Sequence, residues 1–563
     1  MAGGAQAQPQ ISGLGQPKAT VGRRILMSAV LFSIIPALCL IAAFKLTKAN
    51  GPQWLPPGYE NSYSYLLNSL LVVKGQPPYH IDHPGTTTQV FGAIVLRTSS
   101  LKSADELVDS VLRDPERYIA FIHRALLIFT FLSAWICPWI TAVLRRNLAL
   151  GLLIQAPILF FQSVLSFGAW LCSDLMVVPF CIASVCICCL DTAPSSAAEK
   201  DPFGRRTASN HTRINLLIKT RALPILSGLV CAFGIVTKLT FFPLFLISLL
   251  LSRSWKSLIA FAAAFALGLA AALLPIYSQL PRLGDWIVKL ATHTGEYGSG
   301  SVGLPQGSDY LNRILTLLAD EPLVAIIPIA ATLTILVLLL GTTTDNRPSR
   351  AILLQVTVRL FAGQLLSFLA LAKHPYGSNY LIPLCLSTGL NLVWLFYTLR
   401  ISGSNITGRL LGSCVLIGLL VLGFGSFAIS TPKAYAETHR EMTDELSLYR
   451  HAQQLTKNDI RVDYYFSDSP AYALSFGNDI AGRFFSPVLA RLYPKVLFLN
   501  VFTGRFQTFS QFDILPVQIQ KRYDDLYFLG DPTYFPSGTG FDPKTFETID
   551  HAGAYYLQRW TRK

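Results

Sequence analysis

Two acidic side chains, Glu60 and Asp82, follow the first apolar segment of the chain, which runs from about residue 25 to residue 44. Asp82 precedes His83, so an imidazole stands beside a carboxylate. A carboxylate held at a membrane surface can take a proton from a hydroxyl group. Glu60 and Asp82 are therefore candidate general bases, and His83 is a candidate to orient Asp82 or to bind an anionic group.

Both acids also have a structural interpretation. Glu60 can stabilise the first turn of the helix that we expect from Tyr59 to Val73, because a helix N-terminus favours negative charge. Asp82 can be a turn residue ahead of His83. A structural and a chemical role are compatible at both positions.

Further ionisable residues stand beside apolar segments. Lys238 separates two such segments and is a functional candidate by its position, although its side chain can instead extend to the membrane surface. Lys373 and His374 are candidate phosphate-binding residues, because cations beside a bilayer complement a lipid phosphate. Asp174 begins another apolar segment, where it either caps a helix or lines a site.

The composition places the chain among integral membrane proteins. Its 563 residues are 52% hydrophobic and only 14% charged, whereas soluble domains carry about 25% charged residues. Runs of roughly 20 apolar residues are long enough to cross a bilayer. We predict about eleven spans, near 24–46, 119–143, 148–167, 170–190, 222–236, 239–252, 257–276, 322–340, 351–371, 380–398 and 409–430. Segments 222–236 and 239–252 can alternatively form one long helix.

The basic residues predict the orientation of these spans. The net charge of +14 is spread over short loops, which is typical of cytoplasmic loops and excludes a nucleic-acid-binding face. We expect a disordered cytoplasmic N-terminus (1–23) and a transmembrane domain (24–430). The loop 47–118, the segment 277–321 and the tail 431–563 are expected outside the cytoplasm, with a bacterial inner membrane as the predicted location. Segments 59–73 and 86–96 are expected to lie along the membrane interface.

The tail has the polar content and the length of a small domain. Residues 437–455 are predicted to form a helix, and 462–466, 496–499, 526–529 and 554–557 short strands. This alternation favours an α/β domain. All ten cysteines lie in apolar segments, so we expect no disulfide framework. A histidine metal site is conceivable, but no His-x₃-His pair supports it, and we predict no metal or other cofactor.

Three sets of motifs occur in order along the chain. They are Glu60, Lys74-Gly75, Tyr79 and Asp82-His83-Pro84-Gly85 in the first loop, Gly234 to Thr240 around Thr237-Lys238, and Lys373-His374-Pro375 through Asn379-Tyr380-Leu381-Ile382-Pro383. Through these motifs the chain resembles the polytopic glycosyltransferases of the GT-C fold that use polyprenyl-phosphate sugars, such as protein O-mannosyltransferases and the transferase that adds aminoarabinose to lipid A. The resemblance covers about residues 24–430. Asn61 and Asn379 stand where many relatives carry an acid and an arginine.

This resemblance implies a GT-C-like helical bundle that moves a sugar from a polyprenyl-phosphate donor to a glycan, lipid or protein hydroxyl outside the cytoplasm, with inversion. Glu60 or Asp82 is then the base. The implied donor-binding residues are His83, Lys238, Lys373, His374 and Tyr380. Two alternatives stay open. One is a transporter or flippase of lipid-linked glycans, and the other is a non-catalytic relative that binds membrane lipid.

Overall fold

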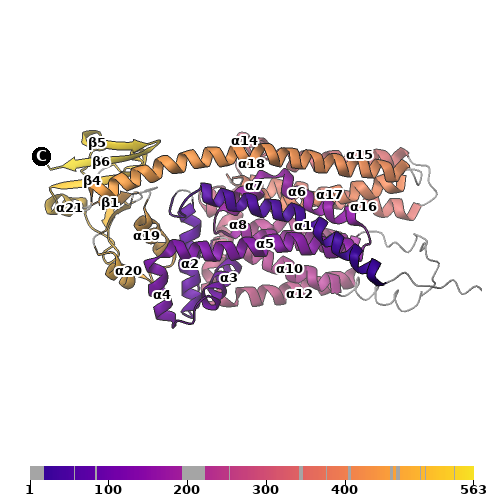
Figure 1. Cartoon of the computed structure of the whole chain (residues 1–563), viewed down its shortest axis with the longest axis horizontal. Coiled ribbons are helices and arrows are strands. Elements are labelled where there is room, and N and C mark those ends of the chain that lie inside the picture. Colours follow the sequence, from indigo (N-terminus) through magenta and orange to yellow (C-terminus); the bar gives the residue numbers. More distant parts are fainter. Residues whose placement is uncertain are drawn as a thin grey trace, which may run out of the picture.

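The computed structural model describes residues 18–55, 58–82, 85–192, 222–252, 254–341, 347–375, 377–402, 407–456, 461–464, 469–494, 496–500, 503–537 and 539–562. In these ranges the chain forms a bundle of long helices with a mixed β-sheet at one end (Figure 1). The predicted fold class, an all-α membrane part followed by an α/β domain, is confirmed.

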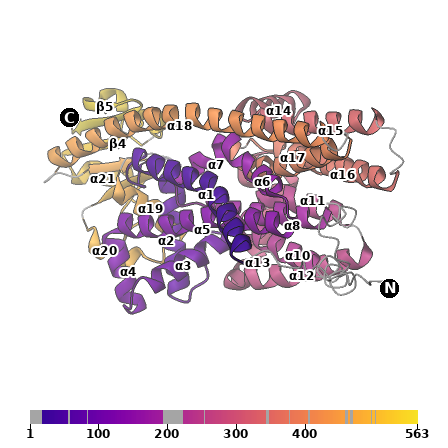
Figure 2. The same cartoon turned by 45° about the vertical axis from the view of Figure 1, so that its right-hand side comes forward.

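Eight helices within the described residues are long and apolar enough to cross a membrane, which makes the chain a multi-pass membrane protein. One of them, α18, follows the whole length of the bundle and reaches the sheet (Figure 2). The eight are α1 (Lys18–Ala49), α5 (Pro115–Leu144), α8 (Ser173–Thr192), α12 (Trp255–Leu273), α15 (Leu323–Gly341), α16 (Arg347–Ala372), α17 (Ile382–Ser402) and α18 (Thr407–Leu455).

The remaining apolar segments are broken, so the predicted count of eleven spans is not confirmed. Helix α6 (Leu148–Phe160) is followed by α7 (Gln162–Ser166) and the 3-10 turn η1 (Phe167–Ala169), with a bend of 79° between the two halves. Helices α10 (Leu223–Thr237) and α11 (Phe242–Leu251) have 15 and 10 residues. Both are shorter than the roughly 20 residues of a straight crossing.

Helices α10 and α11 form a hairpin whose tip is Lys238. The backbone of Lys238 is extended, with φ −158° and ψ 131°, which ends α10 before the 3-10 turn η4 (Leu239–Phe241). Cys231 of α10 is hydrogen-bonded to Ser248 of α11, so the chain reverses at Lys238. Phe241 packs directly on Gly234, where a Cβ atom would lie 2.6 Å from the ring. The alternative of one long helix is therefore wrong.

The loop after α1 contains three helices, α2 (Gly58–Val73), α3 (Thr86–Thr98) and α4 (Ala104–Arg113). The prediction that α2 lies along the membrane interface is wrong, because residues 62–71 are all buried. Helix α2 packs between α3 and α19 (Pro470–Ile480) of the tail. Helix α4 begins with a capping box in which Ser103 and Glu106 satisfy each other's backbone N–H groups.

The segment between α12 and α15 contains two amphipathic helices rather than a long irregular loop. They are α13 (Leu280–Thr292) and α14 (Gly307–Asp320), with the 3-10 turns η5 (Leu274–Gln279) and η6 (Glu296–Gly298) beside α13. The turn η6 and its neighbours connect α13 to α14, and this connection contributes to the candidate site described below.

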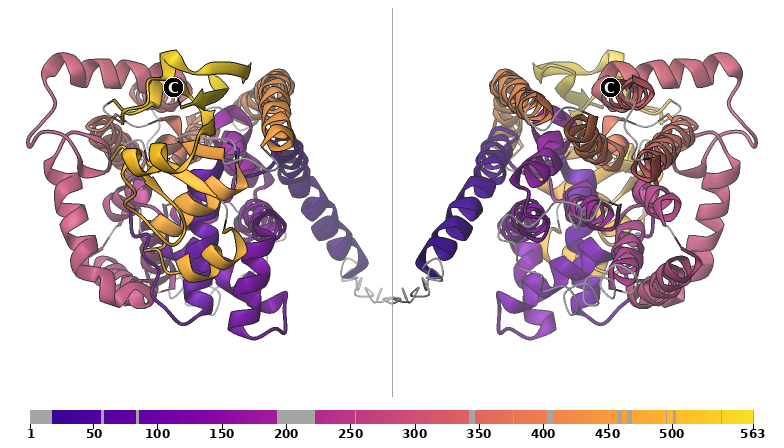
Figure 3. Two further views of the ribbon diagram at one scale, coloured as in Figure 1. Left: turned by 90° about the vertical axis from the view of Figure 1, so that its left-hand side faces the viewer. Right: turned by 90° about the vertical axis from the view of Figure 1, so that its right-hand side faces the viewer.

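The tail is a six-stranded sheet that covers one end of the bundle (Figure 3). The strand order is β3-β2-β1-β4-β6-β5, in which β1 is parallel to β2 and β4 and the outer pairs are antiparallel. Four strands coincide with predicted ones. The elements are β1 (Arg461–Tyr464), α19, α20 (Ser486–Leu492), β2 (Leu497–Asn500), β3 (Arg505–Gln507), α21 (Pro516–Arg522), β4 (Asp525–Gly530), the 3-10 turns η8 (Pro532–Tyr534) and η9 (Pro543–Thr545), β5 (Glu547–Ala552) and β6 (Tyr555–Thr561).

The two faces of this sheet belong to different hydrophobic cores. Phe498, Leu529 and Leu557 join the large core of the helical bundle. Leu499 and Phe528, which point to the opposite face, belong to a separate cluster. The alternation follows from the two-residue period of a β-strand. One face of the tail is therefore attached to the membrane part, and the other face is covered by its own elements.

Candidate functional site

A buried ion pair joins Lys238 to Asp174. The Lys238 Nζ lies 2.6 Å from Asp174 Oδ1, and the two side chains are 3% and 5% exposed. Asp174 lies in the first turn of α8, and Lys238 lies at the tip of the α10–α11 hairpin. The alternative that Lys238 extends to the membrane surface is therefore wrong. Two charges this deeply buried are tolerated only when they are paired.

Tyr380 adds an aromatic face to this ion pair. The Lys238 Nζ lies 4.3 Å from the centre of the Tyr380 ring, which is the geometry of a cation–π contact. Tyr380 lies in the 3-10 turn η7 (Ser378–Leu381), immediately before α17. Two of the predicted binding residues, Lys238 and Tyr380, are thus brought together from positions 142 residues apart in the sequence.

The segment before α14 reaches the same place through Tyr297. The Tyr380 hydroxyl donates a hydrogen bond to the Tyr297 hydroxyl oxygen over 3.4 Å. Tyr297 has φ 52°, a left-handed conformation that residues other than glycine rarely adopt. Backbone strain of this kind persists only where the surroundings fix it. Gly298 follows with φ 82°, so this sharp turn directs Tyr297 toward the ion pair.

The first loop approaches the ion pair through Tyr65 and His80. The Tyr65 hydroxyl is hydrogen-bonded to the side chain of Ser173, the residue before Asp174. The His80 ring lies edge-on to Tyr65, with 5.7 Å between ring centres. Burial lowers the pKa of His80, and the nearby Asp82 carboxylate opposes this shift. Tyr65 and His80 therefore connect the first loop to the start of α8.

A second contact fixes the first loop to the hairpin tip. The hydroxyl oxygens of Thr87, on α3, and Thr237, the last residue of α10, are 2.6 Å apart. This hydrogen bond lies next to Lys238 in the sequence. It holds the first turn of α3 close to the end of α10.

Glu60 lies in the first turn of α2, as its structural interpretation predicts, but its side chain and the whole of His83 lie outside what the structure describes. Glu116 accepts hydrogen bonds from the backbone N–H of Gln53 at 2.8 Å and from the Tyr63 hydroxyl at 2.9 Å. These bonds fasten the beginning of α2 to α5.

Lys373 and His374 contact the backbone of the 291–295 segment. The Lys373 Nζ donates to the carbonyl oxygen of Ala291, and His374 Nδ1 lies 2.9 Å from the carbonyl oxygen of Gly295. Burial lowers the pKa of His374, and the charges of Lys373 and Arg313 lower it further. These two residues therefore brace the segment that presents Tyr297.

Several residues of this site were not singled out from the sequence. They include His80 as a neighbour of Asp82, Tyr65, Tyr297 and two arginines. Arg282 of α13 lies 4.3 Å above the Tyr79 ring and donates to the Tyr79 carbonyl oxygen at 3.0 Å. Arg313 of α14 donates to the Thr294 carbonyl oxygen at 2.9 Å. No local pattern marks Tyr65, Tyr297 or Arg282, because the partner of each lies far away in the sequence.

The part of the chain that the structure describes contains no recognisable metal site. No group of three or more His, Cys, Asp or Glu side chains there is arranged to hold an ion. The absence of a cofactor stays a prediction.

Comparison with known proteins gives a distant likeness. No protein family model matches the chain, and no curated protein matches it. The chain is similar to a crystal structure of ArnT from Cupriavidus metallidurans bound to undecaprenyl phosphate, with a TM-score of 0.46, 10% identity, and coverage of 94% of this chain and 97% of that chain. For the apo state of that protein the TM-score is 0.46, the identity 11%, and the coverage 96% and 98%. Likenesses of this degree do not establish a family.

Proposed function

We propose that the chain is a membrane glycosyltransferase that moves a sugar from a polyprenyl-phosphate donor to an acceptor hydroxyl outside the cytoplasm. The observation that carries the proposal is the buried Lys238–Asp174 pair under Tyr380, at the end of the bundle that also holds the first loop. A cation in such a dry place is suited to a lipid-borne anion, because charge interactions strengthen when water is excluded.

In the proposed reaction, the acceptor oxygen attacks the anomeric carbon of the donor. A new carbon–oxygen bond forms while the bond to the phosphate oxygen breaks, and the configuration is inverted. The hydroxyl proton goes to a carboxylate, Glu60 or Asp82, and polyprenyl phosphate leaves. The acceptor is a glycan, a lipid or a protein.

Lys238 stabilises the departing phosphate in this mechanism. Its ammonium group has three N–H donors, of which one serves Asp174. Asp174 holds the ammonium in place, and the Tyr380 ring covers one side of it. His83 is proposed to assist at the phosphate. Lys373 and His374 are proposed to act through the 291–295 backbone that they contact.

The test is transfer of radiolabelled sugar from a panel of polyprenyl-phosphate donors in membranes that contain the protein. We expect Lys238→Gln, and either Glu60→Gln or Asp82→Asn, to reduce transfer about 100-fold, which is within the typical contribution of a general base. Lys289→Gln is the matched control, because Lys289 is exposed on α13. Wild-type rates in all three site variants would refute the assignment.

A second candidate function is the transport or flipping of a lipid-linked glycan. Two observations favour it, the buried ion pair and the pair of broken segments α6–α7 and α10–α11, since transporters place binding sites at interrupted helices. Reconstituted vesicles with a fluorescent lipid-linked sugar separate the two functions. Movement across the bilayer without any transfer product would favour transport, and transfer without movement would favour the enzyme.

A further inference from the structure

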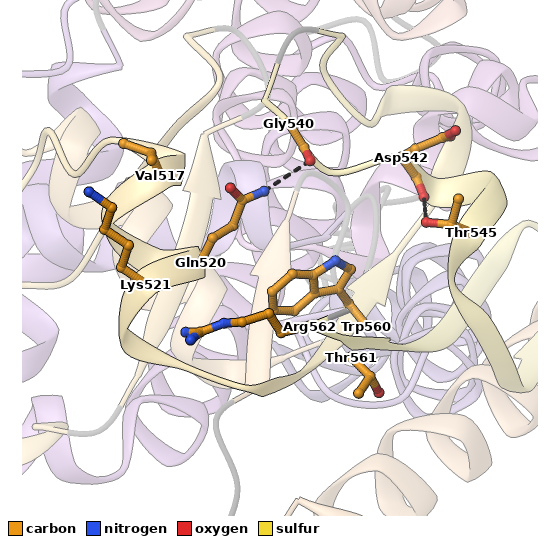
Figure 4. Close-up of a pocket in the computed structure, with 9 residues that line it drawn as sticks. All are labelled: Val517, Gln520, Lys521, Gly540, Asp542, Thr545, Trp560, Thr561 and Arg562. Carbon is orange, nitrogen blue, oxygen red and sulfur yellow. Dashed lines mark hydrogen bonds between the residues drawn. The ribbon is translucent and has the colours of Figure 1, made fainter.

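A cleft lies on the face of the tail that points away from the helical bundle (Figure 4). Trp560 packs against the separate hydrophobic cluster that contains Leu499 and Phe528, whereas Leu557 on the same strand belongs to the core shared with the bundle. The cleft encloses about 530 Å³, which is within the usual range for small-molecule sites. It is lined by Val517, Gln520, Lys521, Gly540, Asp542, Thr545, Trp560, Thr561 and Arg562.

Trp560 supplies a fixed aromatic surface in this cleft. Its ring packs edge-on against Phe541, with 4.9 Å between ring centres and an interplanar angle of 71°. Figure 4 shows the indole at the centre, with its nitrogen toward the side that holds Gly540 and Asp542. An aromatic ring with a polar edge suits a ligand that has an apolar face and hydroxyl groups at its rim.

Polar groups with fixed positions surround this ring. The Gln520 side-chain amide donates to the Gly540 carbonyl oxygen at 2.9 Å, which leaves the Gln520 amide oxygen as an acceptor. The Thr545 hydroxyl donates to the Asp542 carbonyl oxygen at 2.8 Å. The carboxylate of Asp542 accepts from the backbone N–H of Lys544 at 3.0 Å. The amide oxygen of Gln520 and the carboxylate oxygens of Asp542, placed around the indole, are suited to accept hydrogen bonds from sugar hydroxyls.

Two cationic side chains lie at one end of the cleft. Lys521 is exposed at the end of α21. The Arg562 guanidinium is held by the Tyr523 carbonyl oxygen at 3.0 Å and by Asp524 at 3.2 Å. Figure 4 places both on the side of Trp560 opposite Asp542 and Thr545. A ligand that spans the cleft therefore meets hydrogen-bonding groups at one end and cations at the other.

We propose that this cleft binds a short anionic glycan, a saccharide that carries carboxylate or phosphate groups. A sugar ring stacks on Trp560, its hydroxyl groups bond to Gln520 and Asp542, and its anionic group meets Lys521 and Arg562. The proposal does not depend on glycosyl transfer. If the proposed function also holds, the cleft is a docking site for the acceptor.

The test is calorimetric titration of the full-length protein in lipid nanodiscs, without any donor. The probes are tetragalacturonate, a phosphorylated oligosaccharide, the neutral maltotetraose and inorganic phosphate. We expect saturable binding of one or both anionic oligosaccharides, at least about tenfold tighter than maltotetraose or phosphate, because charge-assisted hydrogen bonds are the stronger ones. Binding of tetragalacturonate would identify a carboxylate as the recognised group, and binding of the phosphorylated oligosaccharide would identify a phosphate.

Variants locate the binding. Lys521→Glu and Trp560→Leu should each weaken binding about tenfold or more, while Lys289→Glu, the same charge change at an exposed position of α13, should not. Lys521 is exposed, so its variant tests the site even if Trp560→Leu disturbs folding. Glu60→Gln should bind as wild type does, which separates this site from transfer. Equal affinity of Lys521→Glu and wild type, or no saturable binding, would overturn the proposal.

Discussion

At the scale of single residues, Lys238 marks both what the sequence can predict and what it cannot. A lysine between two apolar segments stands out in the sequence as a functional candidate. Its pairing with Asp174 does not, because Asp174, which the sequence suggests either as a helix cap or as a site residue, lies 64 residues away. Burial and pairing arise only when α8 and the hairpin tip pack together. The sequence shows the unusual position of Lys238, and the fold determines its partner.

Removing one partner of this pair should destabilise the protein more than removing both. Lys238→Met or Asp174→Asn leaves a buried group uncompensated, which costs about 3–5 kcal/mol when a charge is left behind. The double variant Asp174→Asn/Lys238→Met leaves no net charge and should regain most of the lost thermal stability. Transfer should stay lost in the double variant, because Lys238 itself meets the phosphate.

Thermal unfolding in detergent and the transfer assay together check this prediction. Lys289→Met, on the exposed surface of α13, controls for the loss of a lysine. Equal stability of the single and double variants would show that the pair is not coupled. Full transfer by the double variant would assign the pair a purely structural role.

His374 should make the stability of the protein depend on pH below neutrality. Burial holds its folded-state pKa below the ordinary value of 6.5. As pH falls through about 6.5, the unfolded chain takes up a proton that the folded chain does not, so the free energy of unfolding decreases. Above that pH this penalty is absent.

The measurement is the thermal midpoint at pH 7.5, 6.5 and 5.5 for wild type and His374→Gln. Glutamine keeps a donor for the Gly295 carbonyl oxygen and removes the titration, so the variant should lose less stability between pH 7.5 and 5.5. The same decrease in both proteins would assign the pH dependence to other groups. His80 is another candidate, because burial lowers its pKa as well.

At the scale of elements, hydrophobic runs and strands rich in leucine and aromatic residues agree with the prediction, and connections do not. Strands β1, β2, β4 and β6 coincide with predicted segments, whereas β3 and β5 were missed. Strand β3 has three residues and β5 is polar, so neither has a strong local pattern. The expected end of the membrane domain at residue 430 lies inside α18, which continues without a break to Leu455. A change in polarity along a helix does not by itself end the helix.

The packing of α19 on α2 is another feature that no local pattern predicts. A Cβ atom at Gly477 would lie 3.0 Å from the backbone carbonyl carbon and oxygen of Tyr63. Gly477→Ala should therefore push α19 away from α2 and cost about 1–3 kcal/mol, the usual effect of overpacking. Because α2 carries Glu60, transfer should fall as well.

Gly284→Ala is the matched control for this substitution. Gly284 lies in α13, where an added Cβ meets nothing within 4 Å, so the change should be neutral or stabilising by up to about 1 kcal/mol through helix propensity. Thermal midpoints of the two variants are compared in the same detergent. A Gly477→Ala protein as stable and active as wild type would show that the tail does not constrain α2.

At the scale of the whole molecule, the tail and the bundle share one hydrophobic core. Leu474 of α19 and Phe498 of β2 belong to the same cluster as the membrane helices. Arg491 pairs with Asp109 of α4, and the Tyr493 hydroxyl donates to the Leu112 carbonyl oxygen at 2.8 Å. The tail thus lies at the end of the bundle that carries the first loop and the ion pair. Site and tail must therefore face the same compartment.

The predicted orientation places that compartment outside the cytoplasm, and cysteine labelling tests it. Cys414 is the exposed member of the ten cysteines, all of which are free. The variant Cys414→Ser should therefore react little with a maleimide and serves as the background for new cysteines. In this background, Ser537→Cys should react with a membrane-impermeant maleimide in intact spheroplasts, because Ser537 is exposed in the tail. Ser12→Cys should react only after permeabilisation. The reverse pattern would put the ion pair and the glycan cleft in the cytoplasm, and the proposed reaction would then need a donor on that side.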